Sequence, residues 1–206
     1  MISTLVIRVF FLISLIVYLI GFISPLIIVK RSGKAPHGNN EGASILTKLS
    51  SISIVVWFLY IILFTLIGEP IRSFLLITFL NKDYMILMGM VLVAFSFVLE
   101  GLGTYRLREN FRIELPKDET ELVTAGIYQV TRNPIVLEVF LLLTGSFFML
   151  PTIISLMLNI INILTFHSKV KDEEKFLVNR FGSEYKEYKR KVGRYLSAPW
   201  KKRGIK

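Results

Sequence analysis

The stretch "TAGIYQVTRNPIVLEVF", residues 124–140, decides the fold, because its second half opens a long apolar segment. This segment runs from 135 to 166 with Glu138 as its one charged residue. One helix of that length, at about 1.5 Å per residue, would measure roughly 48 Å, whereas a hydrocarbon core is about 30 Å thick. Pro151 divides the segment into halves. We therefore expect a tight helical hairpin over 135–166 with Pro151 near the start of its second helix, rather than one kinked, tilted helix.

The composition of the whole chain also indicates a membrane protein. Hydrophobic residues make up 53% and aromatic residues 13% of the 206 residues, and the mean hydropathy is +0.59. These values are too high for an ordinary soluble domain. Three further apolar runs are long enough to span a bilayer, at 4–29, 49–68 and 84–103, and the last carries only Glu100 as a charge. The expected fold class is all-α, a polytopic membrane protein with about five transmembrane helices.

The distribution of lysine and arginine predicts the orientation. They number 4 in residues 30–49, 2 in 69–83, 5 in 104–134 and 13 in 167–206. With five spans, the three richer segments lie on one face, which the positive-inside rule makes cytoplasmic. A single helix at 135–166 would separate the two most basic segments, so the charges favour the hairpin. The N-terminus is then expected outside, and the C-terminus inside.

Several shorter segments complete this organisation. The first apolar run shows no small-residue cleavage site before Lys30, so we interpret it as a span rather than a signal peptide. Residues 30–44 are expected to form a cytoplasmic loop, and 71–80, too short to span, are expected at the outer interface. The chain divides into an N-terminal three-span region, 1–103, and a C-terminal cofactor-binding and catalytic module, 104–206.

The tail differs from the rest in composition. In "KVKDEEKFLVNRFGSEYKEYKRKVGRYL", residues 169–196, apolar side chains recur at helical spacing, and Gly182 with Ser183 predicts two short helices that meet there. A basic amphipathic anchor on anionic lipid is one interpretation. It leaves the acidic run 172–174 unexplained, because an anionic surface would repel it. We therefore expect a cationic partner for these acids. The apolar positions are Leu177, Phe181, Tyr185, Tyr188 and Val192.

Several classes of site are excluded or disfavoured. The chain has no cysteine, so disulfides and thiolate chemistry are excluded. The two histidines, His37 and His167, are far apart, and no metal site is expected. No phosphate loop is present, and "GLGTY" at Gly101 lacks the third glycine of a dinucleotide fingerprint. No nucleic-acid partner is expected, and the oligomeric state is left open.

The Arg-Asn-Pro turn at 132–134 suggests a ligand site at the mouth of the hairpin. Asn133 is a good N-cap and Pro134 a good first helical residue, so a positive helix end lies beside Arg132. Such an end favours an anion, although a capped helix with a snorkelling arginine is an alternative. The hairpin would bring 132–134 and 172–174 to one face. An anion-binding helix end facing carboxylates suits a zwitterionic ligand.

Glu138 is a separate candidate, because it lies about one turn inside the membrane segment. A charge there is costly unless it is paired, which favours a functional role. The alternative is a glutamate that reaches back to Arg132 or to water. The sequence favours neither.

The C-terminal half resembles the isoprenylcysteine carboxyl methyltransferase family and its phospholipid methyltransferase relatives. The resemblance covers roughly residues 105–196 and rests on "LVTAGIYQVTRNPIVLE", the hairpin, and "DEEKFLVNRFGSEYKEYKRKVGRYL", with "ENF" at 109–111 similar to a family Asn-Trp element. It departs from the family pattern at 135–138, where "IVLE" replaces Met-Tyr-x-Gly, and at Thr120, where histidine is frequent.

This resemblance implies a membrane enzyme that binds S-adenosylmethionine and methylates a lipid or prenylated acceptor. It assigns Tyr128 and Asn133 to the amino-acid end of the cofactor, and Glu173 and Glu174, with Leu177 nearby, to its pocket. Arg132 and Arg194 match basic positions near the cofactor carboxylate or the acceptor. With Glu138 they are the catalytic candidates.

The absence of an obvious catalytic base favours an acceptor that is already ionised, such as the carboxylate of an isoprenylcysteine. Loss of charge on transfer from a sulfonium to a carboxylate also suits a site of low dielectric constant. Three alternatives remain: a phospholipid N-methyltransferase, a sterol-reductase-like oxidoreductase that uses NADPH, and a non-catalytic lipid-binding protein.

Overall fold

The computed structural model describes residues 2–31, 45–107 and 122–196. Within these ranges the chain is helical and forms no β-strand, which confirms the all-α prediction. Most of the predicted loop at 30–44 and the "ENF" element at 109–111 lie outside the described residues. The elements in chain order are α1 (Thr4–Arg31), α2 (Ile45–Ile67), α3 (Glu69–Ser73), η1 (Thr78–Leu80), α4 (Asp83–Leu107), η3 (Gly126–Gln129), α5 (Pro134–Met149) and α6 (Ile153–Lys191).

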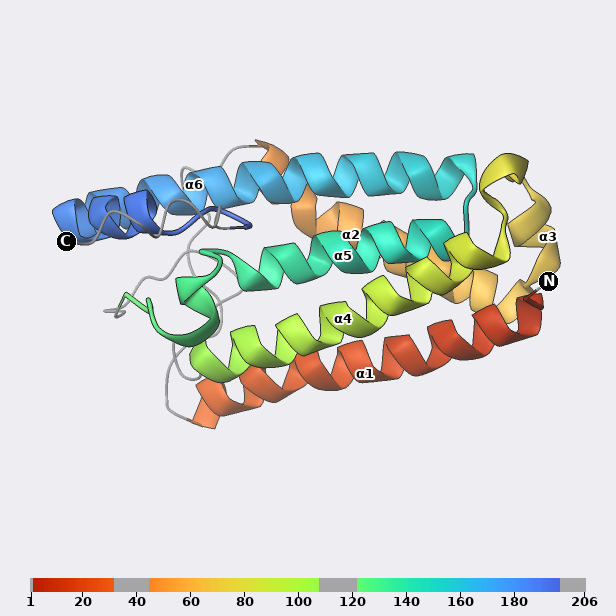
Figure 1. Cartoon of the computed structure of the whole chain (residues 1–206), viewed down its shortest axis with the longest axis horizontal. Helices are drawn as coiled ribbons and strands as arrows, with labels where there is room; N and C mark the ends of the chain where they lie inside the picture. Colours follow the sequence, from red (N-terminus) through yellow and green to blue (C-terminus); the bar gives the residue numbers. More distant parts are fainter. Residues whose placement is uncertain (1, 32–44, 108–121, 197–206) are drawn as a thin grey trace.

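Helices α1, α2, α4, α5 and α6 run side by side in one elongated bundle (Figure 1). Helix α4 packs along α5 and α1, while α2 packs along α6. Four of the helices, α1, α2, α4 and α6, are long and apolar enough to cross a membrane. The fifth, α5, has 16 residues, which at 1.5 Å per residue gives about 24 Å. The predicted five spans therefore correspond to four full-length candidates and one shorter apolar helix.

The hairpin predicted over 135–166 is present, with Pro151 in the turn between α5 and α6. Thr152 caps α6: its side chain accepts a hydrogen bond from Ser155 N, and Ser155 Oγ accepts one from Thr152 N, both at 3.1 Å. The chain after α3 holds this turn, since Ile77 N donates to Pro151 O at 2.7 Å and Ile153 N donates to Leu75 O at 2.9 Å. The segment 71–80 thus caps the hairpin tip.

Close backbone approach and buried amides join the helices. A Cβ added at Gly89 of α4 would lie 2.5 Å from the Gly145 carbonyl oxygen of α5, so only glycine allows this contact. Asn162 of α6 accepts a hydrogen bond from Ser53 Oγ of α2 at 2.9 Å. Asn159 Nδ2 of α6 donates to Leu143 O of α5 at 2.5 Å. Small residues and interhelical hydrogen bonds are the contacts by which helices associate in lipid.

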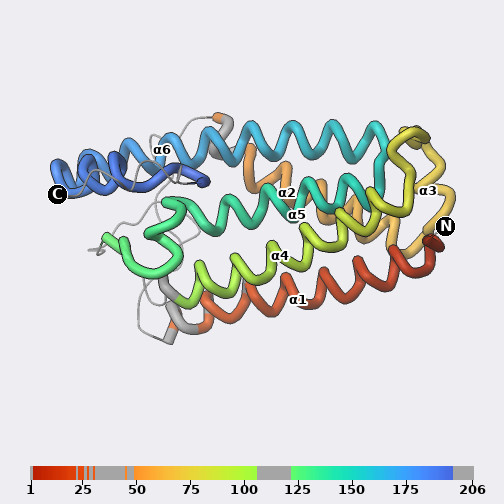
Figure 2. Tube along the Cα trace, in the orientation of Figure 1, coloured from red at the N-terminus to blue at the C-terminus, as the bar shows by residue number. Residues whose placement is uncertain are grey.

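Helix α6 does not end where its apolar part ends. The sequence prediction placed the hairpin boundary at 166, but no glycine or proline occurs between there and Gly182, so the helix continues through the charged tail. Gly182 breaks it, with φ 53° and ψ −119°, a region that is essentially restricted to glycine. The predicted junction at Gly182 is confirmed, and the first tail helix is an extension of α6. Figure 2 shows the chain turning back on itself in this part of α6.

The two ends of the bundle differ. The N-terminus and α3 lie at one end, together with the hairpin tip (Figure 1). The start of α5, the 3₁₀ turn η3 and the charged part of α6 lie at the other. The residues that the sequence singled out at 132–134 and 172–174 are therefore at the same end of the molecule.

Candidate functional site

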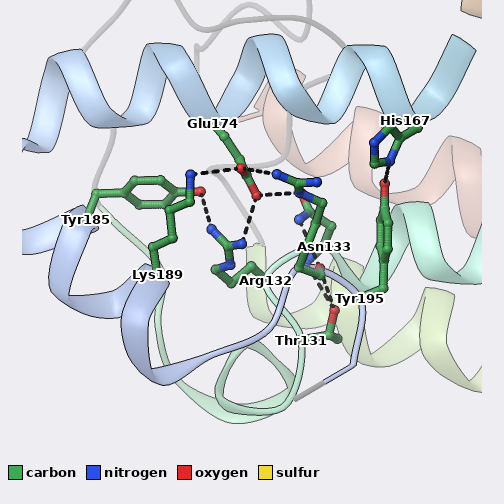
Figure 3. A network of polar contacts seen from close by, with 9 residues as sticks. Thr131, Arg132, Asn133, His167, Glu174, Tyr185, Lys189 and Tyr195 are labelled. Carbon is green, nitrogen blue, oxygen red and sulfur yellow. Dashed lines mark hydrogen bonds and ion pairs between the residues drawn. The ribbon is translucent and has the colours of Figure 1, made fainter. Parts of the chain in front are cut away.

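Glu174 is the centre of an ion-pair cluster at this end of the bundle (Figure 3). Its side chain is only 5% exposed. Arg132 Nη2 lies 3.0 Å from Oε1, and Lys189 Nζ lies 3.3 Å from Oε2. Arg194 binds the carboxylate in a bidentate manner, with Nε at 2.9 Å and Nη2 at 2.8 Å. The cationic partner expected for the acidic run is thus three side chains, all directed at Glu174.

These cations determine the ionisation of Glu174. Burial alone would raise the pKa of its carboxyl group. The hydrogen bond from Arg194 and the charges of Arg132, Arg194 and Lys189 outweigh burial, so the pKa lies below its ordinary value. Glu174 is therefore ionised at neutral pH, and its charge is fully compensated within the protein.

The segment 192–196, which we call the C-terminal strap, lies across the start of α5. Arg132 N donates to Gly193 O at 3.0 Å, and Thr131 Oγ1 donates to Arg194 O at 3.2 Å. Asn133 Nδ2 donates to the same Arg194 oxygen at 3.1 Å. These hydrogen bonds attach the strap to the turn that precedes α5.

The strap changes the role that the sequence predicted for Asn133. Asn133 occupies the N-cap position of α5 and Pro134 follows it, as predicted, but no side-chain hydrogen bond caps the helix. The cap prediction is wrong at the level of the side chain, because the Asn133 amide binds the strap instead. The N–H groups of the first turn of α5 are consequently left without a side-chain cap.

Two charged side chains of this region, Arg132 and Glu173, have polar atoms that could still bind a ligand. Arg132 Nε is buried and has no hydrogen-bond partner among the residues that the structure describes. The Glu173 side chain is exposed, unlike that of its neighbour Glu174, although desolvation by the surrounding protein raises the pKa of the Glu173 carboxyl group. Arg132, a member of the Glu174 cluster, thus has an unpartnered donor, and Glu173, the neighbour of Glu174 in sequence, has an exposed side chain.

Tyrosines form the inner wall of this end. Tyr188 Oη donates to the carbonyl oxygen of Tyr128 at 2.6 Å, and both side chains are buried. Tyr185 packs against Tyr188 with ring centroids 6.0 Å apart, and Leu177 contacts the same cluster. The apolar stripe of the tail therefore packs within the protein. It does not form a lipid-facing surface, as the anchor interpretation would require.

Glu138 is not part of this cluster. It lies one turn further along α5 and is 1% exposed, and its Oε1 atom has no hydrogen-bond partner within the described ranges. Glu100 of α4 and Tyr18 of α1 are titratable residues that lie near it in the bundle. The sequence alternative in which Glu138 reaches back to Arg132 is not what the structure has, because no ion pair joins these two described residues.

The site residues predicted from sequence thus fall into three groups. Arg132, Asn133, Arg194 and Glu174 are brought into direct contact. Tyr128, Glu173 and Leu177 surround them, and Glu138 is separate. Sequence reasoning missed Lys189, Thr131 and the pair formed by His167 Nδ1 and Tyr195 Oη, 2.8 Å apart. Lys189 is one of many tail lysines, so nothing in the sequence distinguishes it.

No set of three or more His, Cys, Asp or Glu side chains in the described part of the chain is arranged to hold a metal ion. The fold and the site together define a polytopic helical membrane protein with a charged site where a helical hairpin emerges at one end of the bundle. Residues 84–184 match the model of the phospholipid methyltransferase family. Through these residues, just under half of the chain, the protein is similar to that family.

The family match starts earlier in the chain than the sequence resemblance, at residue 84 instead of about 105, and it also ends earlier, at 184 instead of 196. It begins at α4, includes α5 and most of α6, and ends before Arg194. None of the curated proteins compared with the chain matches it significantly. The match indicates a membrane methyltransferase.

Proposed function

We propose that the protein transfers a methyl group from S-adenosylmethionine to a lipophilic acceptor, at the end of the bundle that carries Glu174. The uncapped start of α5 beside the unpartnered Arg132 Nε is the observation that carries this proposal. Helix N-termini and arginines both favour carboxylates. The accessible Glu173 supplies the opposite charge for an ammonium group.

The residues present fit this cofactor. Arg132 and the first turn of α5 would hold its carboxylate, Glu173 its ammonium, and the tyrosine wall its apolar parts. When bound, the cofactor supplies a methyl group on a positively charged sulfur. The protein's own contribution is to position the two reactants and exclude water, which needs neither a metal nor a covalent intermediate.

In this proposal Glu174 acts as a positioning residue. Its charge is already compensated, and it fixes Arg132 and Arg194 relative to α6. Glu173 then holds the ammonium by itself, whereas the resemblance assigns both glutamates to the cofactor pocket. The orientation that we propose remains the one from the basic segments, with this site cytoplasmic and the N-terminus outside.

Direct binding tests the proposal. Protein purified in detergent is titrated calorimetrically with S-adenosylmethionine and, separately, with NADPH. We expect heat of binding only from S-adenosylmethionine, and transfer of its radiolabelled methyl group into the organic phase when membrane lipid is added. Binding of NADPH alone would favour an oxidoreductase, and binding of neither would leave a non-catalytic lipid-binding protein.

A matched pair of variants at Asn133 tests the carboxylate site. Asn133→Asp and Asn133→Ser both remove the amide that donates to Arg194 O, and both keep a residue that is favourable at the start of a helix. Only Asp adds a negative charge. We expect Asp to bind S-adenosylmethionine at least about tenfold more weakly than Ser, which corresponds to about 1.4 kcal/mol. Equal affinities would reject the carboxylate site.

A further inference from the structure

The α5–α6 hairpin is short for a segment that crosses a membrane. Helix α5 covers about 24 Å, and the apolar part of α6, residues 153–166, covers about 21 Å at about 1.5 Å per residue. Both arms extend from the end of the bundle that carries the charged part of α6 (Figure 1). Because a hydrocarbon core is about 30 Å thick, a hairpin that begins at one surface ends several ångströms below the other. The tip around Pro151 is then inside the hydrocarbon layer.

A tip at that depth needs hydrogen-bond partners from the protein. In the hydrocarbon region, non-helical backbone is tolerated only where the protein covers it and pairs its polar groups. Residues 74–79, which we call the cap segment, do both. Ile77 N donates to Pro151 O at 2.7 Å. Ile153 N donates to Leu75 O at 2.9 Å, and Thr152, the residue before it, is fully buried. The turn of the hairpin is therefore suited to a place without water.

The cap segment itself exposes large apolar side chains. Phe74 is 60% exposed, Leu75 46% and Phe79 72%. Polar residues join the two ends of the segment, since Arg72 Nη2 donates to Asn81 Oδ1 at 2.8 Å. An exposed apolar cluster with a polar rim marks an interaction site.

Leu75 adopts a backbone conformation that is unfavourable for a residue with a side chain. Its φ is 57°, and within the described ranges every other residue with positive φ is a glycine. A Cβ makes this left-handed region costly. Since Leu75 is nearly half exposed, packing within the protein offsets little of the cost. Contact with lipid would offset it, because removal of apolar surface from water is favourable.

We propose that the cap segment is a re-entrant element, with Phe74, Leu75 and Phe79 among the acyl chains of the leaflet opposite to the tail. Lipid is the partner that the surroundings favour, because the adjoining ends of three helices expose apolar side chains as well. Helix α3 and the N-terminus lie further out along the bundle than the hairpin tip, nearer to water (Figure 1). The inference does not depend on methyl transfer. The exposed residues on α2, α4 and α6 are Leu66, Tyr84 and Ile153.

Spin labelling tests the position of the cap segment, and the chain has no cysteine that would interfere. Phe74→Cys and Phe79→Cys are each labelled with a nitroxide in phosphatidylcholine vesicles. Ser73→Cys and Lys82→Cys, at exposed polar positions on either side of the segment, are the matched controls. Nitroxide relaxation is measured with oxygen, which concentrates in hydrocarbon, and with a nickel chelate, which stays in water. We expect oxygen to be more effective at 74 and 79, and the chelate at 73 and 82.

A second measurement keeps an aromatic side chain in place. Phe79→Trp is compared with the parent in vesicles whose phosphatidylcholine is brominated on the acyl chains. We expect the fluorescence that this variant adds to be quenched by the brominated lipid and not by acrylamide in the water.

Two results would overturn the proposal. Stronger relaxation by the chelate at 74 and 79, together with acrylamide quenching of Phe79→Trp, would show that the cap segment faces water. Spin–spin broadening at 74 and 79, without relaxation by oxygen or quenching by brominated lipid, would show that a second copy of the chain covers it.

Discussion

Glu173 and Glu174 are neighbours on one helix but have different surroundings. Glu174 is buried and contacts three cations, whereas Glu173 is exposed. Removing one partner of a buried ion pair leaves uncompensated charges and is strongly destabilising. Substituting Glu174 should therefore mainly change stability, whereas substituting Glu173 should mainly change ligand binding.

The first prediction compares Glu174→Gln with Glu173→Gln. Glu174→Gln leaves Arg132 without its carboxylate partner, so we expect the free energy of unfolding to fall by an amount on the order of 3 to 5 kcal/mol. The Gln at 173 should leave the melting temperature near that of the parent and weaken S-adenosylmethionine binding by roughly ten- to a hundredfold. Thermal unfolding and calorimetry measure both. The assignment is wrong if Glu173→Gln binds normally.

The second prediction concerns pH. The folded-state pKa of Glu174 is below its unfolded value of about 4.5, so the stabilisation from its ion pairs is fully present above pH 4.5. It is lost as the pH falls through the lower, folded pKa. We expect the melting temperature of the parent to drop over this acidic range and that of Glu174→Gln to drop less. Parallel pH profiles would contradict this.

At the scale of elements, the charged part of α6 reaches the start of α5 because the chain reverses after Gly182. Its backbone has φ 53°, and among the described residues nothing beyond its chain neighbours and its own helix backbone lies within 4 Å of an added Cβ. A substitution there would be disfavoured by backbone strain and not by a clash. The reversal brings Lys189 and the C-terminal strap back to Glu174.

The third prediction is that Gly182→Ala destabilises the reversal by about 1 to 3 kcal/mol, the usual cost of a non-glycine residue in such a backbone region. S-adenosylmethionine affinity should fall with it, because the strap is displaced from α5. Ser183→Ala is the control, as this exposed residue follows the break and keeps ordinary helical geometry. Circular dichroism melting and calorimetry measure the two effects, and equal stability of the two variants would argue against strain at this break.

For the whole molecule, the structure places α3 and the kinked tail at opposite ends of the bundle. The positive-inside rule assigns the tail to the cytoplasm. The fourth prediction is that Ser73→Cys reacts with an impermeant maleimide in intact cells, whereas Ser183→Cys reacts only after permeabilisation; both side chains are exposed. Cysteine is otherwise absent from the chain, so labelling is specific. Reaction of Ser183→Cys from outside would reverse the orientation.

The sequence predicted the hairpin, its proline turn and the break at Gly182, because each depends on local rules of hydrophobic length and glycine or proline geometry. It also predicted that Arg132 and the acids at 172–174 would meet. It did not distinguish Glu173 from Glu174, since which carboxylate is buried depends on how α6 rotates against α5. The strap was not foreseen either, because Asn133 satisfies the local rule for a cap and only tertiary contacts with Arg194 change its role.

The strap has a consequence for biosynthesis. Arg132 and Glu174 are translated well before Arg194, so the growing chain inserts its helices while Glu174 still lacks its bidentate partner. The site reaches its final arrangement only when Arg194 has left the ribosome and the strap has folded back onto the start of α5. A polypeptide that stops after Lys191 would therefore be integrated into the bilayer with every described helix in place, yet with its charged centre incomplete and its start of α5 uncovered.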